Sequence, residues 1–168
     1  MSGFGELVLP VVVRDLSQAD LPHCGWSGSA LHLRSVAIEL DRVAAGDAEY
    51  LAVCAAKSGQ PLAIGGIDYE QTPGAGVIHQ LSTMPALQSC GLGTVLMAAA
   101  EERIRGRGLL RAELGVEHDN PRARALYERL GYVAFEDRPD AWDEEAPDGT
   151  IRRYETVCTM MAKELRLS

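Results

Sequence analysis

The stretch that decides the fold is Leu81-Ser-Thr-Met-Pro-Ala-Leu-Gln-Ser-Cys-Gly-Leu-Gly93. A strand-like segment ends here, Pro85 lies in a short turn, and Gly91 and Gly93 open a run with helical periodicity. A strand that turns into a helix in this way exposes unpaired backbone N–H groups at the positive helix end. Glycine lets an anion approach those groups without a Cβ atom in the way. The stretch therefore predicts a phosphate-binding loop, with a plain strand-to-helix turn as the alternative.

The loop differs from two familiar phosphate-binding motifs. No Gly-Lys-Ser/Thr follows, as a Walker loop requires, and Leu96 occupies the place of the third glycine of a GxGxxG fingerprint. A dinucleotide fold remains an alternative, because Glu113 and Glu117 lie at the distance where such folds carry an acidic ribose-binding residue.

Upstream of the loop, periodicity predicts mostly antiparallel strands and one helix. The expected strands are Val8–Arg14, at a sheet edge because of Pro10, then a hairpin of Tyr50–Ala56 and Pro61–Tyr69, and then Val77–Thr83. Alternation along the last strand places Val77, His79, Leu81 and Thr83 on one face. The helix contains Leu33, Val36, Leu40 and Val43 and ends at Gly46.

Downstream, helices and strands alternate. We expect a helix over Leu92–Ile104, ended by Gly106-Arg-Gly108, and a strand over Leu110–Val116 whose Arg111 and Glu113 face solvent. Asn120-Pro121 caps and opens the next helix, whose apolar stripe is Ala123, Leu126, Tyr127 and Leu130. A short strand Tyr132–Glu136, an acidic loop Asp137–Gly149 and a final strand Arg152–Lys163 follow. The result is one α/β domain over residues 1–168.

Two landmarks carry a family resemblance. Gln88-Ser-Cys-Gly-Leu-Gly93 resembles the Q/R-x-x-G-x-G/A loop of the GNAT N-acetyltransferases. Asn120-Pro-Arg-Ala-Arg-Ala-Leu-Tyr-Glu-Arg-Leu-Gly-Tyr132 resembles the second landmark of that family, an Asn-initiated helix with A-L-Y-x-x-L-G-F/Y. The landmarks have the family's order and spacing, and the resemblance covers residues 77–136 most closely.

The resemblance implies a fold and a reaction. The fold would be a mixed central sheet of six to seven strands flanked by about four helices, with Val77–Thr83 and Arg111–Val116 as a splayed parallel pair. The reaction would be transfer of an acetyl group from acetyl-CoA to a primary amine, by direct attack of the amine on the thioester. The acceptor would be a small-molecule amine or a peptide, and a homodimer is consistent with the resemblance.

By the same resemblance, acetyl-CoA would contact the first landmark, the end of the preceding strand and the second landmark. The implied residues are Leu81, Thr83, Gln88, Ser89, Cys90, Gly91, Leu92, Gly93, Thr94, Asn120, Ala123 and Tyr127. One departure concerns Cys90, because the family often carries Arg or Lys at this position. The neutral thiol adds no charge against the phosphates.

Two side chains are candidates for proton transfer. Tyr127 would face the cofactor sulfur and protonate the leaving thiolate, and its alternative role is packing in the core. His79, as a neutral imidazole, would be the base, and its alternative is a structural histidine. Glu117 and His118 are further candidates, and a backbone N–H near Leu81 would stabilise developing negative charge.

The acidic stretch is the candidate acceptor site. Its carboxylates surround Trp142 and would hold a cation by charge and by contact with the ring, unless the stretch is simply a solvated loop: Asp137, Asp140, Asp143, Glu144, Glu145 and Asp148. Arg152 and Arg153 would neutralise part of this charge. The region Leu16–Ala45 is the other expected contributor.

Composition narrows the class of protein. The formal net charge is −8 over 168 residues, which disfavours nucleic-acid binding and suits a cationic partner. The four cysteines are scattered, which argues against a metal site and a disulfide framework. No apolar run is long enough to cross a bilayer and the start lacks a signal peptide, so we expect a cytoplasmic protein. A non-catalytic acyl-CoA-binding sensor is the alternative to an enzyme.

Overall fold

The computed structural model describes residues 5–167, and within them the chain forms seven strands, three α-helices and three short 3-10 helices. The strands are β1 (Val11–Asp15), β2 (Ala48–Ala55), β3 (Pro61–Asp68), β4 (Gly76–Thr83), β5 (Arg111–Glu117), β6 (Val133–Glu145) and β7 (Ile151–Glu164). The helices are η1 (Gln18–His23), η2 (Gly25–Ser27), α1 (Ala30–Ala45), η3 (Pro85–Leu87), α2 (Leu92–Gly106) and α3 (Pro121–Arg129). The first four residues, on which the expectation about a signal peptide partly rests, lie outside this range. None of the described helices is long and apolar enough to cross a membrane.

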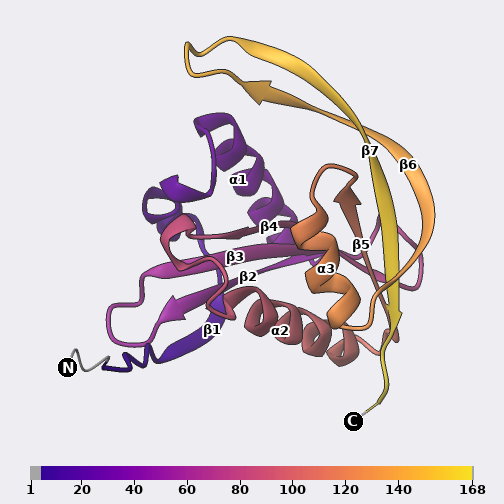
Figure 1. Ribbon diagram of the computed structural model, residues 1–168, viewed down its shortest axis with the longest axis horizontal. Coiled ribbons are helices and arrows are strands. Elements are labelled where there is room, and N and C mark those ends of the chain that lie inside the picture. Colours follow the sequence, from indigo (N-terminus) through magenta and orange to yellow (C-terminus); the bar gives the residue numbers. More distant parts are fainter. Residues whose placement is uncertain (1–4, 168) are drawn as a thin grey trace.

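All seven strands form one mixed sheet in the order β1-β2-β3-β4-β5-β7-β6, which confirms the expected architecture (Figure 1). Within the described chain β4 and β5 are the parallel pair, and every other neighbouring pair is antiparallel. A doubly wound dinucleotide fold needs a mostly parallel sheet, so that alternative is wrong.

The parallel pair opens into a gap. β4 and β5 pair only at Gly76–Ala112, Val77–Glu113 and Ile78–Leu114. Beyond Ile78 and Leu114 the two strands have no register with each other, so their facing edges carry main-chain groups without a neighbouring strand. The predicted splayed pair is therefore present.

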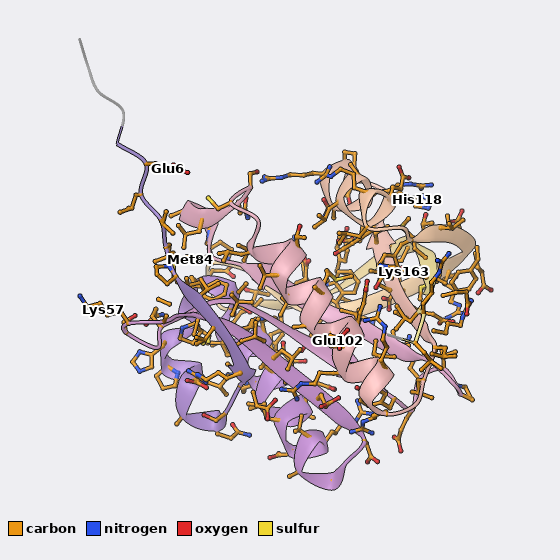
Figure 2. All side chains as sticks on the ribbon, turned by 90° about the horizontal axis from the view of Figure 1, so that it is seen from below. Glu6, Lys57, Met84, Glu102, His118 and Lys163 are labelled. Carbon is orange, nitrogen blue, oxygen red and sulfur yellow. The ribbon has the colours of Figure 1, made fainter. Side chains whose placement is uncertain are left out.

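The two faces of the sheet are covered by different helices. Along β2, Leu51 and Val53 pack into the core under α2, whereas Tyr50 and Cys54 pack into the core under α1. α3 joins the α2 face, because Tyr127 belongs to the same core. Figure 2 shows α2 lying across that face, with Glu102 on its outward side.

Most helices and strands whose ends are marked by a capping residue, glycine or proline are where the sequence predicts them. α1 begins at Ser29, whose hydroxyl accepts a hydrogen bond from the His32 amide, and ends at Gly46 with φ +89°. α3 begins at Asn120, whose side chain accepts from the Ala123 amide at 3.2 Å. β1 is an edge strand as expected, although it starts after Pro10 rather than at Val8.

The prediction of an acidic loop over 137–149 is wrong. These residues continue β6, which pairs with β7 from Val133 to Glu145 and forms a long hairpin. Asp143 and Glu144 lie opposite Arg153 and Arg152, at 3.4 Å and 3.6 Å, so charges on the partner strand compensate the acidic run. The far end of the hairpin arches over α1 (Figure 1), where Glu145 Oε2 accepts from the Leu31 amide at 3.1 Å.

Two predicted face assignments are also wrong. Glu113 does not face solvent: it is buried and receives hydrogen bonds from Arg111 Nε at 2.9 Å and Thr72 Oγ1 at 3.0 Å. The alternation of β4 is broken by a bulge at Gln80, whose φ is +53°, because Ile64 pairs with Ser82 while Gly66 pairs with His79.

The bulge turns His79 and Leu81 to opposite faces. A Cβ on Gly65 would lie 2.6 Å from Leu81 Cδ2 and 3.2 Å from Leu96 Cδ2, so Leu81 is on the α2 face. His79 Nε2 lies 3.6 Å from Glu39 Oε2 of α1. The predicted common face of His79 and Leu81 does not exist.

Candidate active site

A cleft of about 1350 Å³ occupies the gap between β4 and β5 and extends beneath the β6–β7 hairpin. His79 lines it together with four of the residues predicted to contact acetyl-CoA: Leu81, Asn120, Ala123 and Tyr127. Its remaining walls come from the start of α1, the end of β5 and the part of β6 between Asp140 and Glu145. The gap in the sheet is therefore open to two sides, one under α3 and one under α1.

The loop 88–94 presents unpaired donors. Within residues 5–167, no protein acceptor receives the backbone N–H groups of residues 89–94, and the α2 ladder begins with Val95 bonding to Gly91 O at 3.1 Å. Ser89 and Gly91 have φ values of +64° and +89°, which fold this segment into a tight turn. A Cβ on Gly91 would meet nothing within 4 Å. The loop is thus an open row of amides at a helix N-terminus, the arrangement that binds phosphate groups.

A guanidinium lies beside this loop. Arg122 Nη1 donates to Gln88 Oε1 at 3.3 Å, and Nη2 donates to Ser89 Oγ. Arg122 is the second residue of α3, where the helix dipole disfavours a cation. Arg122 is absent from the sequence-predicted site residues, although this unfavourable placement is visible in the sequence. Arg122 supplies next to the loop the positive charge that Cys90, an exposed thiol, does not.

The second landmark places two side chains at the cleft. The Asn120 side-chain oxygen is used in capping α3, so its NH₂ group is the part still able to donate. Tyr127 is 8% exposed, and its hydroxyl has no partner within residues 5–167 while remaining open to the cleft. Burial raises the pKa of Tyr127 above its usual value, so the phenol keeps its proton at neutral pH and is available as a donor.

His79 faces the α1 side of the cleft. Burial lowers the pKa of its imidazole, so the ring is neutral at pH 7. Gln80, brought to the same side by the bulge, accepts from Tyr50 Oη at 3.0 Å and donates to Ser35 Oγ at 3.1 Å. These partners cannot be predicted from the sequence, because they depend on the bulge.

His32 is a further residue that the sequence did not single out. It lies in the first turn of α1 and lines the cleft, and burial lowers its pKa as well. Its Nε2 is occluded and has no hydrogen-bond partner within the described chain. A Cβ on Gly28 would lie 2.8 Å from the ring, so glycine is needed there for the ring to fit.

Of the two further base candidates, Glu117 and His118, only Glu117 lines the main cleft. His118 lies in a smaller groove of about 660 Å³, where its Nε2 is 3.3 Å from Asp137, and it does not line the main cleft. Glu117 lines both spaces and accepts from Tyr154 Oη at 2.9 Å.

Most carboxylates of the predicted acceptor site between Asp137 and Asp148 already have partners within the chain. Asp143, Glu144 and Glu145 contact Arg153, Arg152 and the α1 N-terminus, as described above. Asp148 caps the hairpin turn by accepting from the Thr150 amide, and Asp137 accepts from Thr159 and lies near His118. Within residues 5–167, three cleft-lining carboxylates have no Arg or Lys partner: Glu117, Asp140 and Glu145, and of these Glu145 is bonded to the α1 N-terminus. Trp142 packs against Tyr154 with ring centroids 5.0 Å apart, close to Glu117.

These features fit acetyl-CoA. The unpaired amides and Arg122 suit a diphosphate, and the unpaired edge of β4 suits the amides of a pantetheine arm. Because the gap also opens toward α1, a thioester in it would be accessible to an acceptor from the opposite face.

Comparison with known proteins gives a consistent result. Residues 13–132 match the model of the acetyltransferase (GNAT) family. The mycothiol acetyltransferases of Beutenbergia cavernae and Streptomyces coelicolor are 47% identical over 58 residues and 41% identical over 61 residues. These segments cover 34% and 36% of this chain but only 20% of either relative, about a fifth of its length.

Two solved structures illustrate the similarity of fold. The ribosomal-protein-S18-alanine N-acetyltransferase from Escherichia coli superposes with a TM-score of 0.64 at 20% identity, over 95% of this chain and 96% of that one. The PaiA N-acetyltransferase from Thermoplasma acidophilum, in complex with coenzyme A, gives 0.66 at 16% identity, over 93% and 99%. At such identities the likeness concerns the fold alone.

Proposed function

This chain belongs to the GNAT family of acetyltransferases, and from that premise we propose that it transfers the acetyl group of acetyl-CoA to a primary amine by direct attack of the amine on the thioester. The observation that carries the proposal is the row of unpaired amides at residues 89–94 beside the gap between β4 and β5. As an acetyltransferase it uses acetyl-CoA as co-substrate, which argues against the alternative of a non-catalytic acyl-CoA-binding sensor.

In this proposal the chain holds the co-substrate from three sides. The amides of residues 89–94 and the Arg122 guanidinium bind the diphosphate, and the NH₂ group of Asn120 donates to the pantetheine arm. The edge of β4 from His79 to Thr83, which has no neighbouring strand on the β5 side, supplies main-chain hydrogen bonds to the same arm. A β4 amide near the bulge polarises the thioester carbonyl.

The chemistry needs one group that accepts a proton from the amine and one that donates a proton to the leaving thiolate. An alkylamine with a pKa near 10.4 is mostly protonated at pH 7, and deprotonating it costs about 4–5 kcal/mol. We assign this proton to His79, whose neutral ring lines the α1 side of the cleft. As the C–N bond forms, the acylated nitrogen carries one proton too many and releases it to solvent, from which Tyr127 is reprotonated at the end of the cycle. The C–S bond breaks, and the leaving thiolate takes the proton of Tyr127. Because the raised pKa of Tyr127 makes its phenol the weaker acid, that transfer must accompany bond breaking.

We propose a cationic acceptor. Glu117 and Asp140 supply uncompensated negative charge to the cleft, and Trp142 with Tyr154 supplies aromatic surface beside it. This combination favours a molecule with an amine to be acetylated and a second positive group nearby. The name of the mycothiol acetyltransferases does not fix the acceptor, because the match covers about a fifth of their length.

The direct test is turnover. The purified chain is incubated with isotope-labelled acetyl-CoA and a panel of diamines, aminosugars, amino acids and peptides, and products are identified by mass spectrometry. We expect a labelled N-acetyl product together with one equivalent of CoA. Mass spectrometry is preferable to a thiol reagent because Cys90 is exposed and would react itself. Binding of acetyl-CoA without a product from any amine would contradict the proposal.

The acceptor class has its own test. Glu117→Gln is expected to raise the KM for a dicationic acceptor by about five- to tenfold, and to leave the KM for acetyl-CoA unchanged. The matched control is Asp143→Asn, since Arg153 already neutralises Asp143. Equal effects of the two substitutions would argue for general surface charge instead. A cytoplasmic location and a homodimer stay predictions.

A further inference from the structure

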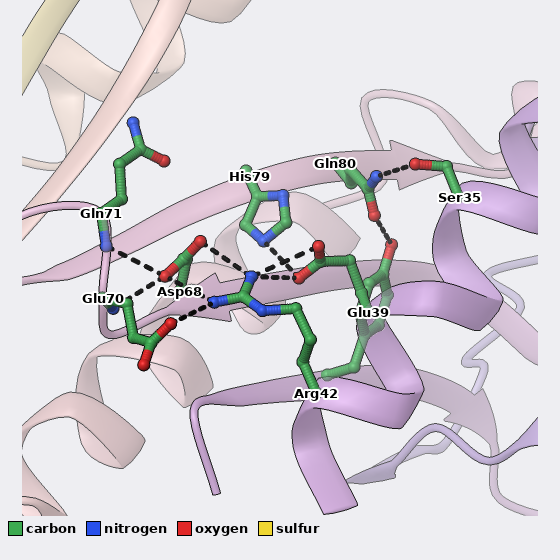
Figure 3. A network of polar contacts seen from close by, with 9 residues as sticks. Ser35, Glu39, Arg42, Asp68, Glu70, Gln71, His79 and Gln80 are labelled. Atoms are coloured by element: carbon green, nitrogen blue, oxygen red, sulfur yellow. Dashed lines mark hydrogen bonds and ion pairs between the residues drawn. The ribbon is translucent and has the colours of Figure 1, made fainter. Parts of the chain in front are cut away.

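The His79 ring occupies a space that depends on a glycine of β3. A Cβ on Gly66 would lie 3.0 Å from both His79 Nε2 and the Tyr50 ring, so this space exists only because β3 carries glycine there. Nε2 is occluded, and within residues 5–167 it has no hydrogen-bond partner. The carboxylate oxygen nearest to it is Glu39 Oε2, at 3.6 Å (Figure 3). That separation is longer than a hydrogen bond, and it becomes an ion pair when the ring is protonated.

The two ring nitrogens therefore have different surroundings. Nε2 faces the Glu39 carboxylate, whereas Nδ1 points away from it (Figure 3) and is not occluded. A neutral imidazole carries one proton. With the proton on Nε2, an N–H group faces the carboxylate. With the proton on Nδ1, a buried lone pair would face the negative oxygen, which is unfavourable. The contact selects the tautomer in which Nδ1 is free to accept a proton.

Glu39 is itself held in place. Arg42 Nη1 lies 3.0 Å from Glu39 Oε2 and 2.9 Å from Asp68 Oδ2, and Nη2 lies 3.5 Å from Glu70 Oε2. Three carboxylates from α1, β3 and the following loop thus share one guanidinium, as Figure 3 shows. The Tyr50 hydroxyl, which also lies at this face, is bonded to Gln80, and Gln80 in turn donates to Ser35. The excess of negative charge favours the imidazolium once His79 has taken a proton.

We propose that Glu39 is a positioning residue that fixes His79 in its Nε2-protonated tautomer, so that Nδ1 receives the proton of the attacking amine. The N–H bond of the amine breaks, an N–H bond forms at Nδ1, and the resulting imidazolium returns its proton to solvent after turnover. This inference rests on the proposed function, because it concerns the base of that reaction.

The first experiment needs no acceptor. Long-range ¹H–¹⁵N NMR spectra of histidine-labelled protein report the tautomer of each ring, and His79→Gln assigns the signal among the four histidines. We expect a single Nε2-protonated tautomer for His79 at pH 7.5, and a mixture in Glu39→Gln, whose amide both donates and accepts. An Nδ1-protonated ring in the unmodified protein would overturn the proposal, whatever the variant does.

The second experiment is a double-mutant cycle on turnover. Glu39→Gln is expected to lower kcat by about tenfold or more, and to shift the acidic limb of the pH profile. In the His79→Gln background the same substitution should have no further effect, because the residue acts through His79. Equal losses in both backgrounds would mean that Glu39 only supports the fold.

Asp41→Asn is the matched control, since it makes the same carboxylate-to-amide change on the exposed side of α1. It is expected to leave both kcat and the His79 tautomer unchanged. If no amine is acetylated by the unmodified chain, the proposed function fails while the NMR result still decides the role of Glu39.

Discussion

Gly91 offers a sharp test of the phosphate loop, because Gly46 is a nearly ideal control. Both glycines have φ +89°, with ψ of 1° and 4°, and in both cases an added Cβ would meet nothing within 4 Å. Gly91 begins α2 in the proposed site, whereas Gly46 ends α1 outside the cleft. A Gly→Ala change at either position therefore introduces the same backbone strain and no steric clash within the chain.

The magnitude follows from that strain. A residue with a Cβ in the left-handed region costs about 1–2 kcal/mol. At Gly46, two hydrogen bonds to the end of α1 hold the conformation, so the strain should lower Tm by about 2–8 °C. At Gly91 the free loop can relax and turn its amides away. Binding then has to restore the strained conformation, and affinity for acetyl-CoA should fall about 5–30-fold.

The assay pairs calorimetric titration of acetyl-CoA with thermal unfolding of both variants. We expect Gly46→Ala to lose stability and keep its affinity, and Gly91→Ala to lose affinity. Unchanged affinity in Gly91→Ala, or an equal loss in both variants, would refute the assignment of the loop to the diphosphate.

Three further outcomes follow from the site. Arg122→Ala is expected to raise the KM for acetyl-CoA about three- to tenfold in steady-state kinetics, while Arg124→Ala, on the same helix and paired with Glu128, leaves it unchanged. Tyr127→Phe should lower kcat by about a hundredfold with unchanged acetyl-CoA affinity in titrations, and an unaltered kcat would remove Tyr127 from the mechanism. Because the pKa of His79 is lowered, its base form persists below pH 6.5, and the acidic limb of a kcat/KM profile should lie below that value. A limb above pH 7 would contradict this assignment.

The sequence was most informative where the structure depends on local geometry. Asn120-Pro121 predicts the start of α3, and the structure shows the cap hydrogen bond at 3.2 Å. Gly46 and Gly91 mark helix boundaries because both adopt a conformation that other residues rarely take. Such signals involve only a few neighbouring residues, so a single sequence contains them in full.

The sequence was misleading where a strand depends on its partner. Residues 137–145 show no apolar alternation, because β6 is an edge strand that is mostly exposed on both faces. Their strand conformation depends on pairing with β7, including Arg152 and Arg153, which follow the turn. The pattern of acidic residues alone is typical of a solvated loop.

The geometry around His79 was not predictable for a related reason. The bulge at Gln80 depends on the register with β3, where the shift falls at the pair Gly65-Gly66. Regular alternation put His79 beside Leu81, but the bulge put it beside Gln80 and brought Glu39 of α1 within contact. The residues of the candidate site were thus easier to name than to orient.

The short pairing between β4 and β5 has a mechanical consequence. Three residue pairs form the main-chain seam between one leaf of the sheet, β1–β4, and the other, β5–β7, and α2 packs across it. A pantetheine arm lying along the unpaired edges of β4 and β5 would hold these two parts of the sheet together. Bound acetyl-CoA would therefore make the site for the acceptor amine more rigid, which favours binding of acetyl-CoA before the amine. Slower hydrogen exchange along β4 and β5 on addition of acetyl-CoA is the expected signature of this increase in rigidity.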